Sequence, residues 1–379
     1  MKIENIGWSI GNFCNAKCHH CYSWRQRQGH EILSLDEIDT ILDKIISYGI
    51  KTVNFGGNEP IFTNGKDLGS TTLPYIIDRL YERNIICGIT TNGFTEKYLY
   101  ENHFDTFMKV NDWDFSLDAP CSKEHNKNRN VSNAFEMVLE GLDICTKHKR
   151  LKSIVVAGMH TNLKPDVLNQ FITLAQKYEA DFRINILKPT EEHHKTLLPS
   201  VEKIYESMDW LLEKMDMVCM SESIFASQVG IGCNGSPCGE KSFRIRTKIN
   251  GRVPITPCVY LDLDAGDILS ESIDSIVSGA VFSCFIHRKK VIPTQCHNMN
   301  CKFIKSCRGG CTARTLLIKG KYDEPDPYCP YLLERYVSEK LQKKEVMKQN
   351  TDNVIRVHEN YLCTWIGRTK HKKCNYMKG

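Results

Sequence analysis

The sequence predicts an α/β fold, namely a partial (β/α)6 TIM-like barrel followed by a cysteine-rich domain of short strands and loops. Short apolar runs alternate with stretches of helical period from Ile6 to about Leu187. From about Gly230 to Pro330, cysteine, glycine and proline become frequent instead. With 379 residues, the chain is long enough for two domains that each bury a core.

Six apolar runs of the first half are strand candidates, at Gly7–Ile10, Thr52–Phe55, Ile85–Thr90, Trp113–Leu117, Ser153–Ala157 and Phe182–Leu187. The first helix is predicted to begin after Ser34, because Ser34 and Glu37 match a capping box, and Gly49 suits its C-terminal cap. Further helices are expected near residues 73–82, 95–101, 131–148, 165–178 and 201–217. Alternating strands and helices favour a parallel sheet, and six units are too few to close an eight-stranded barrel.

The composition excludes several classes of protein. Charges of both signs are mixed, and the net charge of +5 is too small to argue for nucleic-acid binding. No apolar run reaches the roughly 18 residues of a membrane span, and the N-terminus lacks the pattern of a secretory signal. We therefore expect a cytoplasmic protein. Because thiols stay reduced there, most of the 18 cysteines are expected to bind metal rather than to form disulfides.

Three cysteines with CxxxCxxC spacing, Cys14, Cys18 and Cys21, directly follow the first predicted strand. Three thiolates can hold three irons of a [4Fe–4S] cube and leave the fourth iron open for another ligand. Four close cysteines would instead close a cluster or a zinc site. The triplet therefore predicts a cluster with an open iron, with a zinc site or a chance grouping as the alternative.

Glycines and polar side chains stand at or just after the carboxyl ends of later predicted strands: Gly56, Gly57, Glu59, Asn92, Ser116, Asp118, Arg129, Asn185 and Lys188. In folds of this kind, ligands bind at these ends. Glycines let a ligand approach the backbone, a carboxylate suits an ammonium group, and an arginine can hold a carboxylate. Taken singly, each residue also fits a turn, a helix cap or a surface position.

The second half contains eight further cysteines in a framework: Cys233, Cys238, Cys258, Cys296, Cys301, Cys307, Cys311 and Cys329. Eight thiolates are enough for two closed four-cysteine clusters. Zinc ribbons are the alternative, since tetrahedral sites of four cysteines are common.

The first half resembles the radical S-adenosylmethionine (SAM) enzymes, through the cysteine triplet and the aromatic Tyr22 after it. The stretch from Gly56 to Pro60 is similar to the GGEP motif of that family, with Asn58 inserted, and the stretch from Ser116 to Arg129 is similar to its S-x-D-G segment. This resemblance implies that SAM contacts Tyr22, Gly56, Gly57, Glu59, Asn92, Ser116, Asp118, Arg129 and Asn185.

The second half resembles the SPASM extension of peptide-modifying radical SAM enzymes, because Cys307, Cys311 and Cys329 have its spacing around an Arg-Gly-Gly stretch. The gap between Cys296 and Cys301 is wider than in the family. The resemblance implies two auxiliary [4Fe–4S] clusters with interleaved ligands. Cys233, Cys238, Cys258 and Cys311 would hold the first, and Cys296, Cys301, Cys307 and Cys329 the second.

The resemblance implies a barrel over residues 1–218, a SPASM domain over 219–335 and a basic tail over 336–379. It implies an enzyme that generates a 5′-deoxyadenosyl radical to crosslink a ribosomally made peptide or excise part of its backbone. Expected partners are the precursor peptide, a reductant such as flavodoxin or ferredoxin, and a separate leader-recognition protein, since the first strand begins almost at once. Alternatives are formylglycine formation as in anaerobic sulfatase maturases, an iron–sulfur electron-transfer protein and a zinc-binding module.

Overall fold

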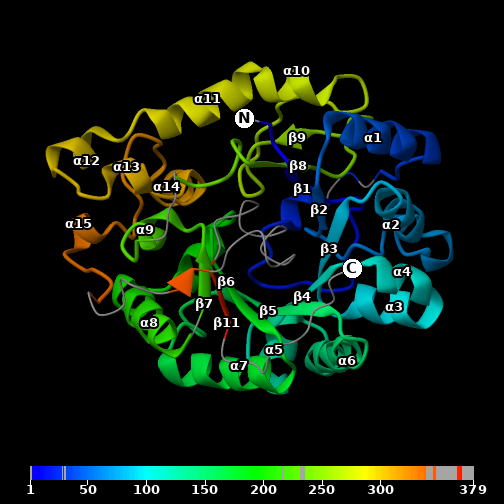
Figure 1. The fold of residues 1–379 in the computed structure, drawn as a ribbon, viewed down its shortest axis with the longest axis horizontal. Coiled ribbons are helices and arrows are strands. Elements are labelled where there is room, and N and C mark those ends of the chain that lie inside the picture. The colour runs from blue at the N-terminus through cyan, green and yellow to red at the C-terminus, as the bar shows by residue number, and fades with distance from the viewer. Residues whose placement is uncertain are drawn as a thin grey trace.

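The computed structural model describes residues 2–27, 29, 31–215, 217–230, 235–338, 345–346 and 365–368. Its first half is a curved sheet of parallel strands with helices on the outside (Figure 1). The strands are β1 Asn5–Trp8, β2 Thr52–Phe55, β3 Ile86–Thr91, β4 Asp112–Ser116, β5 Leu151–Gly158 and β6 Asp181–Ile186. Each pairs in parallel with the next one along the chain. The predicted partial barrel is therefore confirmed, with strand ends shifted by one or two residues.

Eight helices of the described chain accompany these strands: α1 Leu35–Tyr48, α2 Leu73–Tyr81, α3 Phe94–Asn102, α4 Phe104–Lys109, α5 Ser122–Arg129, α6 Ala134–Lys147, α7 Pro165–Lys177 and α8 Val201–Lys214. The capping box at Ser34 and the left-handed C-cap at Gly49 are both present around α1. The sequence did not predict α4 or α5. The α5 sequence is almost wholly polar, so it has no apolar period to reveal it.

The sheet does not end where the barrel was predicted to end. Strand β8 Ser242–Ile245, from the cysteine-rich half, pairs in parallel with β1, and β9 Ile255–Thr256 pairs with β8. The predicted boundary at residue 218 falls inside β7 Met217–Met220. The rise in cysteine and glycine content marks a change of composition, whereas the backbone pairing between β1 and β8 runs across it.

The cysteine-rich half is more helical than predicted. It contains α9 Ser223–Ala226, α10 Ile273–Ser278, α11 Ala280–Lys290, α12 Thr294–Asn298, α13 Ile304–Cys307, α14 Thr312–Lys319 and α15 Pro330–Leu333. Two of these helices, α10 and α11, meet at Gly279, whose backbone is extended. Figure 1 shows α10 and α11 in yellow along one edge of the molecule.

Part of the basic tail joins the sheet. Strand β11 Trp365–Arg368 lies antiparallel between β6 and β7, and β10 Glu345–Val346 pairs with β7. Trp365 is buried, and Arg368 Nε lies 2.7 Å from Asp181 Oδ1. This stretch of the predicted basic tail is therefore part of the sheet, and its pairing covers an otherwise open edge of β6. The rest of the tail lies outside the described residues.

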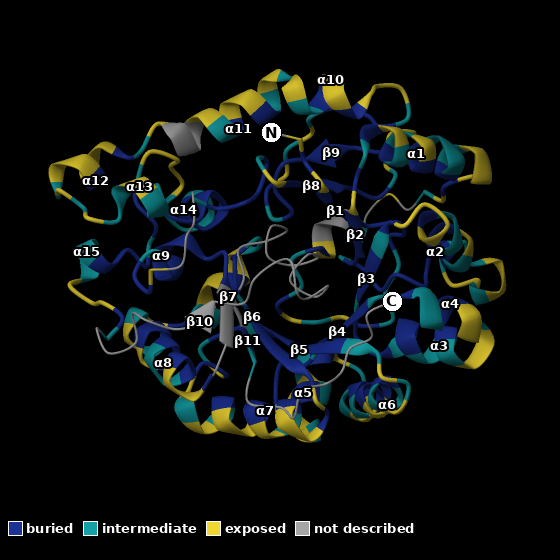
Figure 2. Ribbon diagram, viewed as in Figure 1, coloured by how far each residue is buried: buried dark blue, intermediate teal, exposed yellow. Residues whose placement is uncertain are grey.

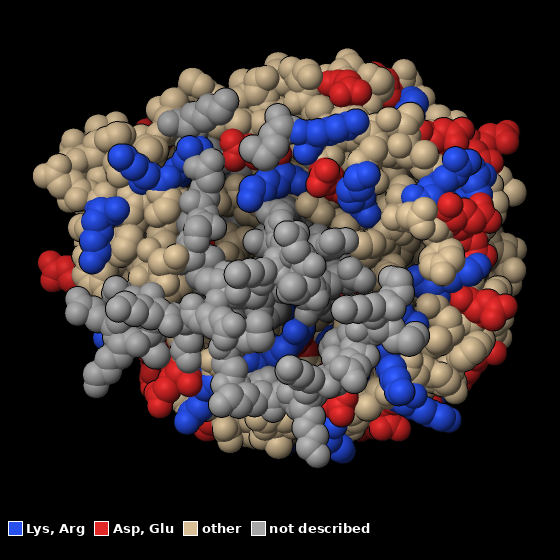
Figure 3. All heavy atoms as spheres, viewed as in Figure 1, with Lys and Arg blue, Asp and Glu red and all other residues tan. Residues whose placement is uncertain are grey.

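The core lies between the sheet and its helices. Figure 2 shows buried residues along the strands and exposed residues on the outer faces of the helices. The buried residues include large aromatic side chains such as Trp8, Phe55, Trp113 and Phe115. Outside the grey residues, the face in Figure 3 shows Lys and Arg interspersed with Asp and Glu. Within the described chain, no helix combines the length and the apolar character that crossing a bilayer requires.

Candidate active site

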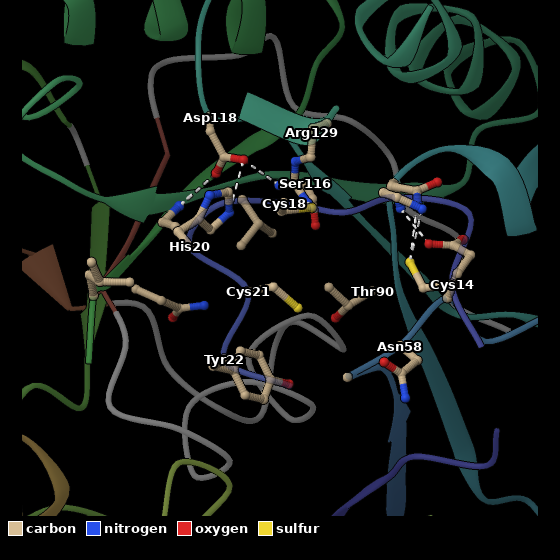
Figure 4. Close-up of a pocket in the computed structure, with 18 of the residues that line it drawn as sticks. Cys14, Cys18, His20, Cys21, Tyr22, Asn58, Thr90, Ser116, Asp118 and Arg129 are labelled. Atoms are coloured by element: carbon tan, nitrogen blue, oxygen red, sulfur yellow. Dashed lines mark hydrogen bonds and ion pairs between the residues drawn. The ribbon is translucent and has the colours of Figure 1, made fainter. Parts of the chain in front are cut away.

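The three cysteines of the first loop open onto one cavity. Their loop follows β1, which lies between β2 and β8 in the sheet. Cys14, Cys18 and Cys21 all line a cavity of about 160 Å³. Figure 4 shows them together with Thr90 and Ser116, from the ends of β3 and β4. The structure therefore brings the predicted triplet to the edge of the sheet where ligands of this fold bind.

Cationic side chains approach two of these thiols. Arg27 Nη2 lies 3.3 Å from Cys21 Sγ, and Arg129 Nη1 lies 3.7 Å from Cys18 Sγ. Burial raises the pKa of the Cys14 thiol to about 12, and burial also raises the pKa of Cys18 against the effect of Arg129. Positive charge is therefore needed to lower these thiol pKa values and form the thiolates that bind metal. The two arginines and a bound metal would supply that charge.

Most of the predicted SAM contacts line the same cavity. They are Tyr22, Gly57, Glu59, Asn92, Ser116, Asp118, Arg129 and Asn185. They come from the cysteine loop and from the ends of four parallel strands or the loops and helix that follow them. Gly56 does not line the cavity. Its carbonyl oxygen faces the protein, where it accepts hydrogen bonds from Ser9 Oγ at 2.7 Å and Arg244 Nη2 at 2.5 Å.

The loop after β2 depends on a glycine at position 57. Gly57 has a φ of 99°, in the region that favours glycine. A Cβ there would also overlap Ser9 Oγ and the Arg244 guanidinium. The close approach of these groups holds the loop against β1 and β8, so its backbone reaches the cavity edge.

The Glu59 carboxylate is held by the protein. It accepts a hydrogen bond from Thr91 Oγ1 and from the backbone N–H groups of Asn92 and Thr95, the latter two both at 2.9 Å. Burial raises the pKa of Glu59, and these hydrogen bonds oppose that effect. In this arrangement Glu59 fixes the loop after β3 against the loop after β2, in addition to lining the cavity.

Asn58, the inserted residue, ties the glycine loop to the cysteine loop. Its Nδ2 donates to the Gly11 carbonyl at 2.9 Å, and its Oδ1 accepts from Ser23 Oγ at 3.2 Å and Arg27 Nε at 3.1 Å. The sequence presented Asn58 only as a departure from a motif. Its role could not be foreseen, because its partners come from three separate positions in the first loop.

Asp118 and Arg129 form an internal ion pair. Arg129 Nη2 lies 2.6 Å from Asp118 Oδ2, and His20 Nε2 lies 3.2 Å from the same oxygen (Figure 4). Burial opposes ionisation of Asp118, but Arg129 and His20 hold its pKa well below the usual range. The sequence indicated a ligand carboxylate for Arg129. In the structure, its first partners are Asp118 and the cysteine loop, which these contacts anchor to β4.

Four side chains complete the cavity on the side of the cysteine-rich half. Asn185 lines it from β6, and its Oδ1 is buried without a hydrogen bond among the described residues. Tyr22 and Tyr260 pack edge to face, with ring centroids 5.1 Å apart. Tyr260 was not predicted, although it lies two residues after Cys258. Lys188 Nζ lies 5.2 Å from the Tyr260 ring centroid and is buried, so a surface position is wrong for Lys188.

A chain of buried charges leads from this cavity into the cysteine-rich half. Lys188 Nζ lies 3.1 Å from Glu222 Oε1. Arg314 Nη2 lies 2.8 Å from Glu222 Oε2 and 2.6 Å from Asp326 Oδ2. All four side chains are at most 1% exposed. Asp326 also accepts hydrogen bonds from the backbone N–H of Cys311 at 2.8 Å and of Tyr328 at 3.0 Å.

These charges are mutually compensated. Burial alone would raise the pKa of Glu222, but Arg314 and Lys188 lower it to about 2. Burial likewise disfavours the charged form of Lys188, but Glu222 keeps its pKa above the ordinary value. We call Lys188, Glu222, Arg314 and Asp326 the buried charge network. It connects the first cavity with residues beside both groups of cysteines.

The structure gathers the later cysteines into two groups. Cys238, Cys258 and Cys311 pack in one cluster of buried residues. Cys296, Cys301, Cys307 and Cys329 line a small cavity of about 20 Å³. This division matches the interleaved sets that the resemblance implied. Cys233 lies outside the described residues.

The donor chemistry of all three sites fits iron–sulfur clusters. The cysteines of the triplet and of the two groups, as far as they are described, are free thiols. In the described chain, no three His, Cys, Asp or Glu side chains converge as they would around one metal ion. A cluster does not require such convergence, because each thiolate binds its own iron.

The comparisons with known proteins agree with this site. Residues 8–178 match the family described as the radical SAM superfamily. Over 359 residues the chain is 25% identical to the mycofactocin maturase MftC of Mycolicibacterium smegmatis, covering 90% of this chain and 85% of that protein.

Two solved structures share the fold. Native anSMEcpe with bound AdoMet and the Cp18Cys peptide has a TM-score of 0.64 at 17% identity, covering 87% of this chain and 95% of that one. Streptococcus suis SuiB bound to the precursor peptide SuiA has a TM-score of 0.61 at 13% identity, covering 87% and 76%. The family match, together with the cysteine triplet and its cavity, shows that residues 8–178 carry a radical SAM domain.

Proposed function

We propose that this enzyme modifies a ribosomally made peptide by radical SAM chemistry at the cavity of the cysteine triplet. The observation that carries the proposal is the position of Cys14, Cys18 and Cys21, which share one cavity with side chains from four strand ends. When bound there, a [4Fe–4S] cluster and SAM supply a 5′-deoxyadenosyl radical that takes a hydrogen atom from the substrate.

The residues of the cavity divide into two roles. Asn92, Ser116 and Asn185 present polar side chains to the cavity and would contact SAM, beside the backbone at Gly57 and the ring of Tyr22. Glu59, Asp118 and Arg129 would act mainly by holding the loops that carry those contacts, because each is already bound by the protein. Gly56 would support the loop from behind.

Two auxiliary clusters are the second part of the proposal. Cys238, Cys258 and Cys311, with Cys233, would hold the first, and Cys296, Cys301, Cys307 and Cys329 would hold the second. The grouping of the described thiols supports this assignment. Asp326 lines the second site and binds the backbone of Cys311 from the first, so it would keep both at a set separation.

The expected substrate is a precursor peptide, in keeping with the names of MftC as a maturase and of SuiB as bound to its precursor peptide. The reaction would be a crosslink, through carbon or sulfur, or an excision from the backbone. A cytoplasmic reductant such as flavodoxin or ferredoxin would supply electrons, and a separate protein would recognise the leader.

The test begins with SAM cleavage. The protein is reconstituted anaerobically with iron and sulfide, reduced, and given SAM, and 5′-deoxyadenosine is measured. Wild-type protein should form it, and Cys18→Ala should not. Cys121→Ala is the matched control, because Cys121 is exposed and does not line the cavity. A wild-type protein that forms no 5′-deoxyadenosine refutes the proposal and favours an electron-transfer or zinc-binding protein.

The substrate is tested by co-expression with candidate precursor peptides, followed by mapping of the mass change. Loss of two hydrogens at linked residues indicates a crosslink, and a larger loss indicates excision. The likeness to anSMEcpe keeps formylglycine formation as the second candidate. An aldehyde that forms at a single Cys or Ser and reacts with a hydrazide would select that candidate.

A further inference from the structure

A second and larger cavity adjoins the first. Its volume is about 430 Å³, within the range of about 300–1,000 Å³ typical of ligand pockets. Tyr22 and Tyr260 line both cavities, so this edge-to-face pair forms part of the wall between them. A molecule in the second cavity would therefore lie next to the proposed SAM site, with the rings of Tyr22 and Tyr260 in the wall between the two.

Another part of the lining packs around the first group of auxiliary cysteines. Leu261 and Leu263 follow Cys258 in the chain, and Leu316 and Leu317 follow Cys311 on α14. These leucines pack against the cluster of buried residues that contains Cys238, Cys258 and Cys311. The second cavity thus adjoins both the triplet cavity and the residues that pack around the first auxiliary cysteines.

The lining is mostly apolar, and the charges that line it are paired. Val259, Leu261, Leu263, Leu316, Leu317 and Tyr322 are among the residues that give it apolar surface. Arg246 Nη1 lies 2.6 Å from Asp262 Oδ1, and Asp264 Oδ2 lies 2.7 Å from Arg252 Nη1. Burying a further charge beside these apolar walls would cost free energy without a partner to offset it.

We propose that this second cavity seats an uncharged apolar side chain, aliphatic or aromatic, of the precursor peptide, and that Tyr260 determines how far that side chain reaches toward the SAM site. The inference rests on the proposed function, which supplies the peptide as occupant. To that function it adds the class of side chain that the peptide carries near the residue from which the hydrogen atom is taken. Because the two cavities share Tyr22 and Tyr260 in their walls, the peptide at the first cavity is favoured over any separate ligand as the occupant of the second.

The experiment uses reconstituted enzyme with SAM bound and four probes, Ac-Gly-Xaa-Gly-NH2 with Phe, Leu, Asp or Lys at the centre. Binding is followed by ligand-observed NMR. The wild type should bind the Phe and Leu probes about tenfold more tightly than the Asp and Lys probes. Leu263→Trp and Leu317→Trp, which fill the cavity from a loop and from α14, should each remove that preference.

Leu35→Trp is the matched control, because Leu35 is 56% exposed at the start of α1. It should bind all four probes as the wild type does. SAM cleavage without peptide is measured in every variant and should stay within about twofold of the wild type, because none of the three leucines lines the triplet cavity.

If the wild type binds the four probes with equal affinity, the inference is overturned, and the variants need not be measured. Unchanged preference in both filled variants, with SAM cleavage intact, overturns it as well. Failure of the proposed function gives a different result, since the wild type would then form no 5′-deoxyadenosine whatever its probe preference.

Discussion

Replacing Arg314 by methionine tests whether the buried charge network stabilises the fold. Methionine keeps an unbranched apolar stem but removes the only cation that bridges Glu222 and Asp326 among the described residues. Breaking a buried ion pair from one side costs about 3–5 kcal/mol, because the remaining charge is left without compensation.

The structure places Arg314→Met at the lower end of that range. Glu222 keeps Lys188 at 3.1 Å, and Asp326 keeps two backbone N–H groups. We therefore expect a loss of about 3 kcal/mol in the free energy of unfolding. In a chain of this size, such a loss lowers the thermal midpoint by an amount on the order of 5 °C. Arg314→Lys keeps the charge but not the fork geometry, so it should fall between the wild type and Arg314→Met.

The assay is thermal unfolding of reconstituted protein, followed by circular dichroism under one set of anaerobic conditions. Lys97→Met is the control, because Lys97 lies 2.9 Å from Glu140 in a pair whose side chains are 37% and 50% exposed. Such a surface pair contributes less than about 1 kcal/mol. If Arg314→Met and Lys97→Met have the same thermal midpoint, the buried charge network does not stabilise the fold and the reasoning fails.

Three further predictions concern single residues. Burial raises the pKa of Glu96 from 4.5 to about 8, so the contribution of Glu96 to stability should be full below pH 4.5 and be lost as the pH rises toward 8. Glu96→Gln should flatten that slope, and an unchanged slope in chemical denaturation would contradict the assignment. Gly57→Ala should lower stability by about 2 kcal/mol or more, because the left-handed backbone is strained for alanine; equal midpoints would exclude this. Asn58→Ala should release iron to a chelator about tenfold faster, because Asn58 braces the cysteine loop, and release at the wild-type rate would count against that role.

Local patterns in the sequence predicted most of the barrel. Apolar runs located all six parallel strands of β1–β6, and the pair Ser34 and Glu37 located the start of α1. Such signals depend on neighbours three or four residues apart, which a single sequence displays directly. The grouping of the later cysteines followed from family resemblance rather than from periodicity, since nothing in the spacing alone pairs Cys258 with Cys311.

Contacts between distant segments could not be predicted in the same way. Arg129 suited a ligand carboxylate by residue type, but Asp118 lies within 2.6 Å of it. Lys188 was compatible with the surface until Glu222, from a different element, gave it a buried partner. Whether a charged side chain meets a ligand or another side chain depends on packing that only the folded chain determines.

The pairing of β1 with β8 limits how this enzyme can be divided or recombined. The strand that leads into the cysteine triplet has one neighbour from each half of the chain, with a register that matches Asn5 to Thr52 on one side and to Ser242 on the other. A fragment that stops before β8 would present an unpaired edge at β1 and invite aggregation. Chimeras that exchange the cysteine-rich half between related enzymes should therefore carry β8 together with the donor residues that pack on it, because the joint lies inside a sheet rather than in a linker.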